Sequence, residues 1–218
     1  MTQGEECDAA SHRAVARGVF PHLCSPSPTK LTVWRKSLLF NSRGYTVYDD
    51  SDGRIVFRVD NYAHNWREEA FLMDPHGHVL LTVQRCKKVK ENICWWAFLQ
   101  MLSMLECWEA YKGDKNGCRR AAPPVFKATK ALGNPSCTIS VAATDGEHQH
   151  YKMYWSRRHE WTKLYRASIS LSPVAEVSRK CGGSRPVMLG KDVFSLRLQP
   201  GLDQAMVMAM IMIIDVMK

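Results

Sequence analysis

The 218-residue sequence predicts a mainly β fold, a closed antiparallel barrel of about twelve strands that encloses an apolar C-terminal α-helix. Two observations carry this prediction. Short strand-like segments follow one another with turns about every 8–12 residues, which is typical of barrels and sandwiches. The chain then ends on an unbroken apolar run, 205–214, which a barrel can enclose. Closure also removes exposed strand edges.

We expect residues 203–217 to form the enclosed helix. Pro200-Gly201 ends the preceding strand, Asp203 is a suitable N-cap, and the methionines and alanines favour a helix. The isoleucines alone would favour a strand, but the segment is much longer than the usual ~5–6 residues. Such a helix is about 22 Å long, too short for the ~30 Å core of a bilayer, so protein must surround it. The residues predicted to build this central helix include Asp203, Met206, Met210, Ile213 and Ile214.

The strands are predicted in chain order from β-branched and aromatic runs between turn signals. Residues 1–30 lack periodicity and are expected to be an irregular, disordered lead-in to one domain, 31–218. Asp52-Gly53 between two such runs is the strongest hairpin signal. The predicted strands are 31–35, 37–41, 45–49, 54–60, 69–73, 78–85, 124–130, 137–142, 150–155, 174–179 and 193–199.

Composition limits the environment and the partners. The net charge of +9 favours anionic partners without choosing among them. Eight scattered cysteines without a C-x-x-C pair, and a first segment without a secretory signal, indicate reduced and mostly buried thiols in the cytoplasm.

Motifs for catalysis or metal binding do not occur. The sequence has no Gly-x-Ser-x-Gly, no phosphate-binding Gly-Lys-Ser/Thr loop and no His-Glu-x-x-His, so we expect neither an enzyme nor a cofactor. The pairs His76/His78 and His148/His150 lack a third ligand, so we expect no metal site. Residues 49–53 are predicted to form a turn rather than a calcium loop. We expect Asp215 to face water at the mouth of the barrel.

Several segments resemble the plant LURP-one-related family, which shares the tubby C-terminal domain-like fold. The segments are 31–40, 44–49, 56–62, 80–85, 108–113 and 174–177, and the most specific is 189–203, which leads into the apolar tail. The resemblance covers about 31–217. It implies a twelve-stranded barrel around a central helix, and kinship with phospholipid scramblases and tubby-like membrane-tethered transcription factors. It also implies a link of some members to plant defence.

Residues 93–105 depart from the family pattern by inserting an apolar segment with two tryptophans. One interpretation is an additional segment, such as a translated intron, that lies outside the barrel. The other is an interfacial membrane element, because the segment follows the basic stretch 85–90.

These observations predict a monomeric, non-enzymatic protein that binds anionic phospholipid or phosphoinositide surfaces reversibly. The predicted lipid-binding residues are Arg85, Lys87, Lys88, Lys90, Arg157 and Arg158. No tubby lipid-binding motif is present, so no residue is assigned from that family. The alternative is a protein–protein interaction module with an unknown partner. We expect no nucleic acid partner, because no stacking platform or groove-reading helix is evident. The expected location is the cytoplasm, with peripheral binding at the plasma membrane and a nuclear location left open.

Overall fold

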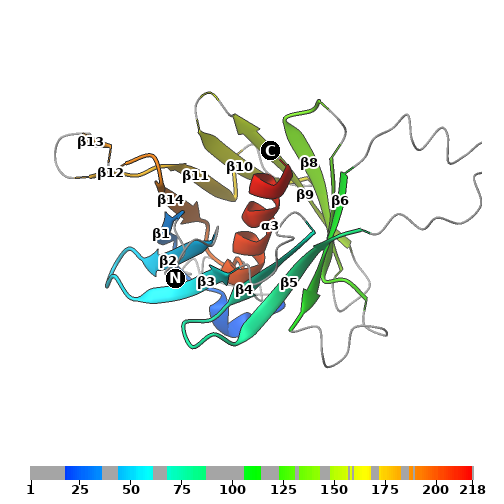
Figure 1. The fold of residues 1–218 in the computed structure, drawn as a ribbon, viewed down its shortest axis with the longest axis horizontal. Helices are drawn as coiled ribbons and strands as arrows, with labels where there is room; N and C mark the ends of the chain where they lie inside the picture. Colours follow the sequence, from blue (N-terminus) through cyan, green and yellow to red (C-terminus); the bar gives the residue numbers. More distant parts are fainter. Residues whose placement is uncertain are drawn as a thin grey trace, which may run out of the picture.

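A computed structural model describes residues 18–35, 44–60, 68–86, 106–113, 123–130, 133–142, 148–156, 158, 160–167, 172–182, 187–188 and 190–217. Twelve antiparallel strands close into a barrel around helix α3 (Gln204–Met217). Figure 1 shows the helix inside the ring of strands. The predicted fold class is confirmed.

Most barrel strands pair with their neighbours in the chain, and β14 closes the barrel by lying between β1 and β11. The barrel strands are β1 (Thr29–Trp34), β2 (Tyr45–Asp49), β3 (Ile55–Asp60), β4 (Glu69–Met73), β5 (Val79–Arg85), β6 (Glu106–Lys112), β7 (Phe126–Lys130), β8 (Ser136–Ala142), β9 (His148–Ser156), β10 (Trp161–Arg166), β11 (Ala175–Arg179) and β14 (Val193–Leu198). A separate two-stranded sheet pairs β12 (Cys181–Gly182) with β13 (Val187–Met188). Strand β6 is covered only by the family resemblance at 108–113, and strands β10, β12 and β13 were not predicted. The predicted strand 37–41 lies outside the described residues.

The core lies between the inner face of the barrel and α3. Strand residues alternate between the two faces, so that Leu31 and Val33 of β1 point to the helix. Methionine side chains are flexible and fill the irregular space around the helix axis. The predicted helix residues Asp203, Met206, Met210, Ile213 and Ile214 are all buried, which confirms the central helix. The side chain of Asp215 lies outside the described residues.

The strand connections divide between two ends of the barrel, because successive strands run in opposite directions. We name the end at which α3 begins the lower end and the end at which it finishes the upper end (Figure 1). Strand β14 descends to Leu198, which pairs with Thr29, and α3 then rises through the barrel. The connections at the upper end are therefore 35–44, 61–68, 86–105, 131–135, 157–160 and 180–192. Those at the lower end are 50–54, 74–78, 113–125, 143–147, 167–174 and 199–203.

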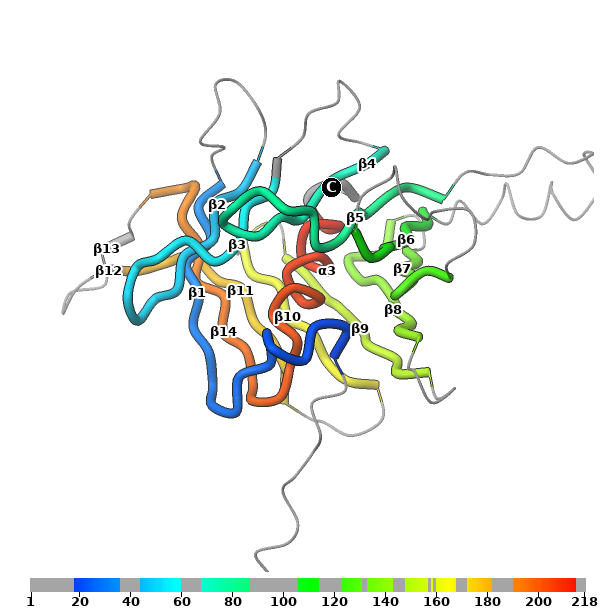
Figure 2. Tube along the Cα trace, turned by 90° about the horizontal axis from the view of Figure 1, so that it is seen from below, coloured from blue at the N-terminus to red at the C-terminus, as the bar shows by residue number. Residues whose placement is uncertain are grey.

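The segment that precedes β1 is ordered, which corrects the prediction for the part of 1–30 that the structure describes. Its short helix η1 (Pro21–Leu23) lies beside the start of α3, where Cys24 forms a backbone bridge with Asp203 (Figure 2). Phe20 is 6% exposed, and its backbone N–H donates to Asp203 Oδ2 at 2.7 Å. Asp203 Oδ1 accepts from the backbone N–H of Met206 at 3.1 Å. One buried carboxylate therefore caps α3 and also holds the N-terminal segment.

The described cysteines differ in part from the expected reduced, buried thiols. Cys86 and Cys107 form a disulfide between the end of β5 and the start of β6, where the strand pairing brings their Cα atoms to 5.3 Å. Cys137 is buried, which raises the pKa of its thiol to about 12 and keeps it protonated. Cys181 is exposed and Cys24 is half-buried. The expectation is therefore wrong for the disulfide pair and for Cys181.

Candidate functional site

Exposed basic side chains gather at the upper end of the barrel. Arg85 is the last residue of β5, and Arg158 lies in the turn from β9 to β10. Arg35 follows β1, and Lys191 precedes β14. All four side chains are exposed. The structure thus brings two of the predicted lipid-binding residues, Arg85 and Arg158, to one end of the molecule. Lys87, Lys88, Lys90 and Arg157 lie outside the described residues.

The charges of the described connection residues differ in sign between the two ends. Among the described residues, the net charge of the upper connections is +1, from Arg35, Arg158, Lys180 and Lys191 against Glu68, Glu160 and Asp192. The described residues of the lower connections have a net charge of −3, from Arg54 against Asp50, Asp52, Asp74 and Asp203. Such an asymmetry orients a protein in the field of an anionic surface.

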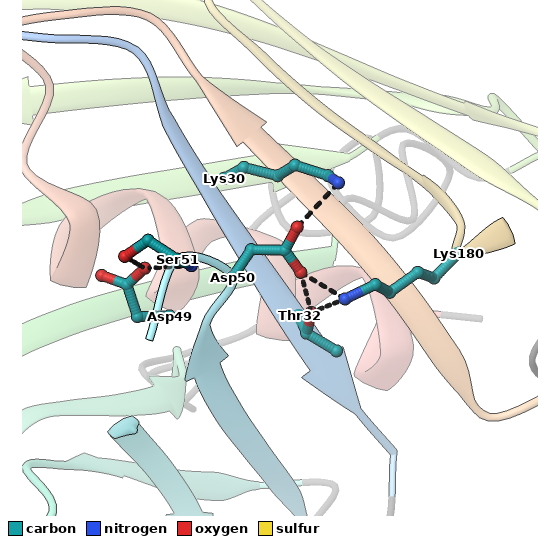
Figure 3. Close-up of polar contacts among 6 residues, drawn as sticks. All are labelled: Lys30, Thr32, Asp49, Asp50, Ser51 and Lys180. Carbon is teal, nitrogen blue, oxygen red and sulfur yellow. Dashed lines mark hydrogen bonds and ion pairs between the residues drawn. The ribbon is translucent and has the colours of Figure 1, made fainter. Parts of the chain in front are cut away.

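Lys180 of the upper connections forms an ion pair on the outer wall of the barrel. Figure 3 shows the Asp50 carboxylate between two lysines, with Lys30 Nζ 2.7 Å from Oδ2 and Lys180 Nζ in contact with Oδ1. The hydroxyl of Thr32 donates to Oδ1 at 2.6 Å. Partial burial alone would raise the pKa of Asp50, but the hydrogen bonds from Lys180, Lys30 and Thr32 hold it well below its usual range. Lys180 therefore joins strands across β14 and adds little to the positive field of the upper end.

A cavity of about 230 Å³ also opens at the upper end, between α3 and the strands around β14. Met208, Ile211 and Ile214 of α3 form one wall. Arg35 also lines the cavity, with its guanidinium carbon 5.1 Å from the centroid of the Phe194 ring. The cavity combines apolar walls with a cationic group.

Glu160 lines the same cavity in an unusual backbone conformation. With φ of +51° it is the one non-glycine residue with positive φ in the described part of the chain. Residues other than glycine rarely adopt this left-handed backbone conformation, which costs of the order of 1 kcal/mol of folding free energy. The carboxylate of Glu160 forms an ion pair with Arg179. This turn therefore carries a paired charge at the edge of the cavity.

Two of the groups considered for metal binding, His78 and the segment 49–53, make contacts within turns. His78 Nδ1 lies 2.9 Å from Asp74 Oδ2 within the β4–β5 turn. The segment 49–53 forms the predicted turn, in which Asp49 Oδ1 accepts from the backbone N–H of Ser51 at 2.9 Å. Cys86, Cys107 and Glu109 lie close enough to share an ion, but the two sulfur atoms are joined as a disulfide.

The fold defines the class of protein as a closed β-barrel built around its own C-terminal helix. The chain belongs to the LURP-one-related family, whose sequence profile matches residues 29–215. It is 35% identical over 190 residues to Protein LURP-one-related 5 of Arabidopsis thaliana, covering 85% of this chain and 81% of that protein. It is 32% identical over 205 residues to Protein LURP-one-related 8 of the same plant, covering 91% and 94%.

A solved structure supports the fold. The X-ray structure of an Arabidopsis thaliana protein matches with a TM-score of 0.57 at 18% sequence identity, covering 90% of this chain and 95% of that one. At this identity the likeness concerns the fold alone. Among the described residues, no helix is long and apolar enough to cross a membrane.

Sequence reasoning missed the cavity, the ion pair of Glu160 at its edge and the ion pairs of Asp50 on the outer wall. The cavity walls come from α3 and from strands that are far apart in the sequence, so no local pattern marks them. The Asp-rich turn 49–53 was recognised as a turn, but the contact of Asp50 with Lys180 depends on the closure of the barrel through β14.

Proposed function

We propose that this protein is a non-enzymatic module that associates reversibly with anionic membrane surfaces, including phosphoinositides, through the upper end of the barrel. The observation that carries the proposal is that the exposed basic residues Arg35, Arg85, Arg158 and Lys191 share the upper end, whereas the described lower connections have a net charge of −3. Each lysine or arginine near an anionic surface contributes about 1 kcal/mol. The role in plant defence and the kinship with scramblases and tubby-like proteins, implied by the family resemblance, are part of this proposal.

The helix on the axis of the barrel supports a surface role. Met208, Ala209 and Met210 of α3 are 0% exposed, so the helix occupies the barrel axis. Large partners therefore contact the protein at the ends and on the outer wall of the barrel. Arg35, Arg85 and Lys191 lie at or next to strand ends, so the barrel determines where these charges are, which suits a scaffold for a charged surface.

Vesicle sedimentation tests the proposal with two charge-matched triple variants. The first, Arg85→Glu, Arg158→Glu and Lys191→Glu, changes three exposed residues of the upper end. We expect binding to vesicles containing phosphatidylserine or phosphoinositide to fall by at least about 100-fold, at roughly 1 kcal/mol for each residue. Binding of the unmodified protein should also weaken at high salt, because salt screens exposed charges.

The control variant reverses the same number of exposed charges elsewhere. It carries Arg54→Glu at the lower end, Lys112→Glu at the lower end of β6 and Lys152→Glu on the outer wall of β9. We expect it to bind anionic vesicles at least ten times more tightly than the upper-end variant. Equal loss in both variants, or binding that is independent of salt, would contradict the proposal.

The outer wall favours a second candidate, a protein-interaction module. Half-buried aromatic residues of β9 and β10 face outward there, with the Tyr154 and Tyr165 rings 5.8 Å apart and Lys163 Nζ 5.5 Å from the Trp161 ring. Aromatic residues are enriched at protein interfaces. An interaction of this kind should persist at high salt and be lost in a Tyr154→Ala, Tyr165→Ala variant, whereas vesicle binding should not depend on these residues.

A further inference from the structure

The cavity at the upper end has features that membrane association does not require. Its apolar walls are formed by Val33, Val177, Phe194, Met208, Ile211 and Ile214, and Arg35 lies among the polar residues that line it. We propose that this cavity binds the alkyl chain of a single-chain anionic amphiphile, with its carboxylate or phosphate held by Arg35. This inference goes beyond membrane association, because it concerns one bound molecule and a different set of residues.

The size and the chemistry of the walls favour an alkyl chain. Apolar cavities of about 150 Å³ in proteins stay dry and bind small apolar molecules. The cavity of about 230 Å³ is larger and opens to solvent. It has apolar side chains on both the helix and the strands, beside the polar residues Ser156, Glu160 and Thr162. With roughly 30 Å³ for each water-sized group, it holds about seven or eight methylene groups. Met208 is flexible and adapts to a chain that enters beside it.

The position of Arg35 supplies the anionic preference. It directly follows β1, its side chain is exposed, and its guanidinium carbon lies 5.1 Å from the Phe194 ring centroid. The cation therefore sits beside the apolar wall formed by that ring. Guanidinium groups bind carboxylate and phosphate through two parallel hydrogen bonds. The Glu160 carboxylate at the same cavity is paired with Arg179, so it opposes an incoming anion less than an unpaired acid would.

Methyl NMR of the methionines tests the inference directly. Protein labelled with ¹³C at the methionine methyl groups is titrated with butanoate, hexanoate, octanoate and dodecanoate. Met208 reports on the cavity, and Met206, near the start of α3 and not among the cavity residues, serves as the control signal. Comparison with a Met208→Leu variant assigns the signal.

We expect the Met208 signal to shift and the Met206 signal to stay. Affinity should rise about fourfold for each added methylene, the factor that corresponds to ~0.8 kcal/mol per buried CH₂. The increase should level off near eight carbons, where the cavity is full. No shift at Met208, or equal shifts at both methionines, would overturn the proposal. A continued increase to dodecanoate would also overturn it, because it indicates non-specific surfactant binding.

Two variants separate the contributions of the anionic head group and the alkyl chain of the ligand. Arg35→Gln should weaken octanoate binding at least tenfold and leave octanol binding unchanged. Val177→Phe should fill the cavity and abolish binding of both ligands, with an unchanged or higher Tm. If Arg35→Gln weakens octanol equally, or if Val177→Phe still binds octanoate, the assigned site is wrong.

Sedimentation with vesicles distinguishes two sources of the bound alkyl chain. A free fatty acid and a lipid in a bilayer present the same chemistry to the cavity. If the chain comes from bilayer lipid, Val177→Phe should reduce sedimentation with phosphatidylserine vesicles. If the ligand is a free amphiphile, sedimentation should be unchanged while octanoate binding is lost. Arg85, Arg158 and Lys191 do not line the cavity. The variant of these three residues therefore tests membrane binding, and the octanoate titration tests the cavity, so that either proposal can fail without the other.

Discussion

Replacement of Asp203 by alanine tests how the start of α3 is held. The carboxylate is 1% exposed and accepts hydrogen bonds from the backbone N–H groups of Phe20 and Met206. In the Asp203→Ala variant both donors lose their acceptor. The N-terminal segment and the helix should therefore be destabilised together.

The expected change in the free energy of unfolding combines two losses and one gain. Removing an N-cap costs about 1 kcal/mol, and leaving the buried N–H of Phe20 without an acceptor costs about 1–3 kcal/mol. Burial raises the pKa of Asp203 despite its hydrogen bonds, so the ionised carboxylate is itself unfavourable at neutral pH. Its removal offsets part of the loss. We expect a net decrease of about 2 kcal/mol at pH 7, and about 1 kcal/mol for Asp203→Asn, which retains one acceptor.

Urea denaturation between pH 3.5 and 7 measures both the size and the pH dependence of this effect. The pKa of Asp203 is higher in the folded than in the unfolded protein. Its contribution to stability is therefore fully present below the unfolded pKa and is lost as pH rises through the folded pKa. The deficit of Asp203→Ala should be largest at acid pH and shrink toward neutrality. A change below about 0.5 kcal/mol, which is typical of ordinary surface positions, or a deficit that grows toward pH 7, would refute this reasoning.

Three further predictions concern other contacts. A Cβ at Gly18 would lie 2.9 Å from both Asp203 Cβ and Cys24 Sγ, so Gly18→Ala should cost about 1–3 kcal/mol in urea denaturation, and a neutral effect would contradict the placement of this segment. Asp50→Asn should cost about 1 kcal/mol at pH 7. Because the folded pKa of Asp50 is lowered, this deficit should fade as pH falls below the unfolded pKa, and a deficit that persists there would argue against the ion pairs. Reduction of the disulfide that encloses 86–107 should cost about 3 kcal/mol for a loop of roughly 20 residues, and thiol titration of the denatured protein should reveal two additional thiols after reduction.

Local patterns were sufficient for most of the fold. Strands β2 and β4 begin and end where the alternating runs and turn signals placed them, and α3 begins directly after the predicted N-cap Asp203. Strand β10 was missed although its inward residues alternate. The turn that precedes it uses Glu160 in a left-handed conformation instead of glycine, so the usual turn signal is absent.

Contacts between distant parts of the chain were not predictable from local patterns. The backbone N–H of Phe20 donates to Asp203, 183 positions later in the sequence. The disulfide depends on the pairing of β5 with β6. The basic clusters were visible in the sequence, but the common end of Arg85 and Arg158 follows only from the number and direction of the strands between them. The cavity follows only from the packing of α3 against the closed barrel.

The orientation of the barrel on a membrane tests the central claim most directly. A photo-reactive benzoylphenylalanine is introduced at Lys191 of the upper end or, in a matched protein, at Arg54 of the lower end. Both positions are exposed, and each replacement removes one positive charge. After irradiation on vesicles containing phosphatidylserine, mass spectrometry should find lipid adducts at position 191 and few or none at position 54. Equal adducts at the two positions, or adducts mainly at position 54, would contradict membrane binding through the upper end.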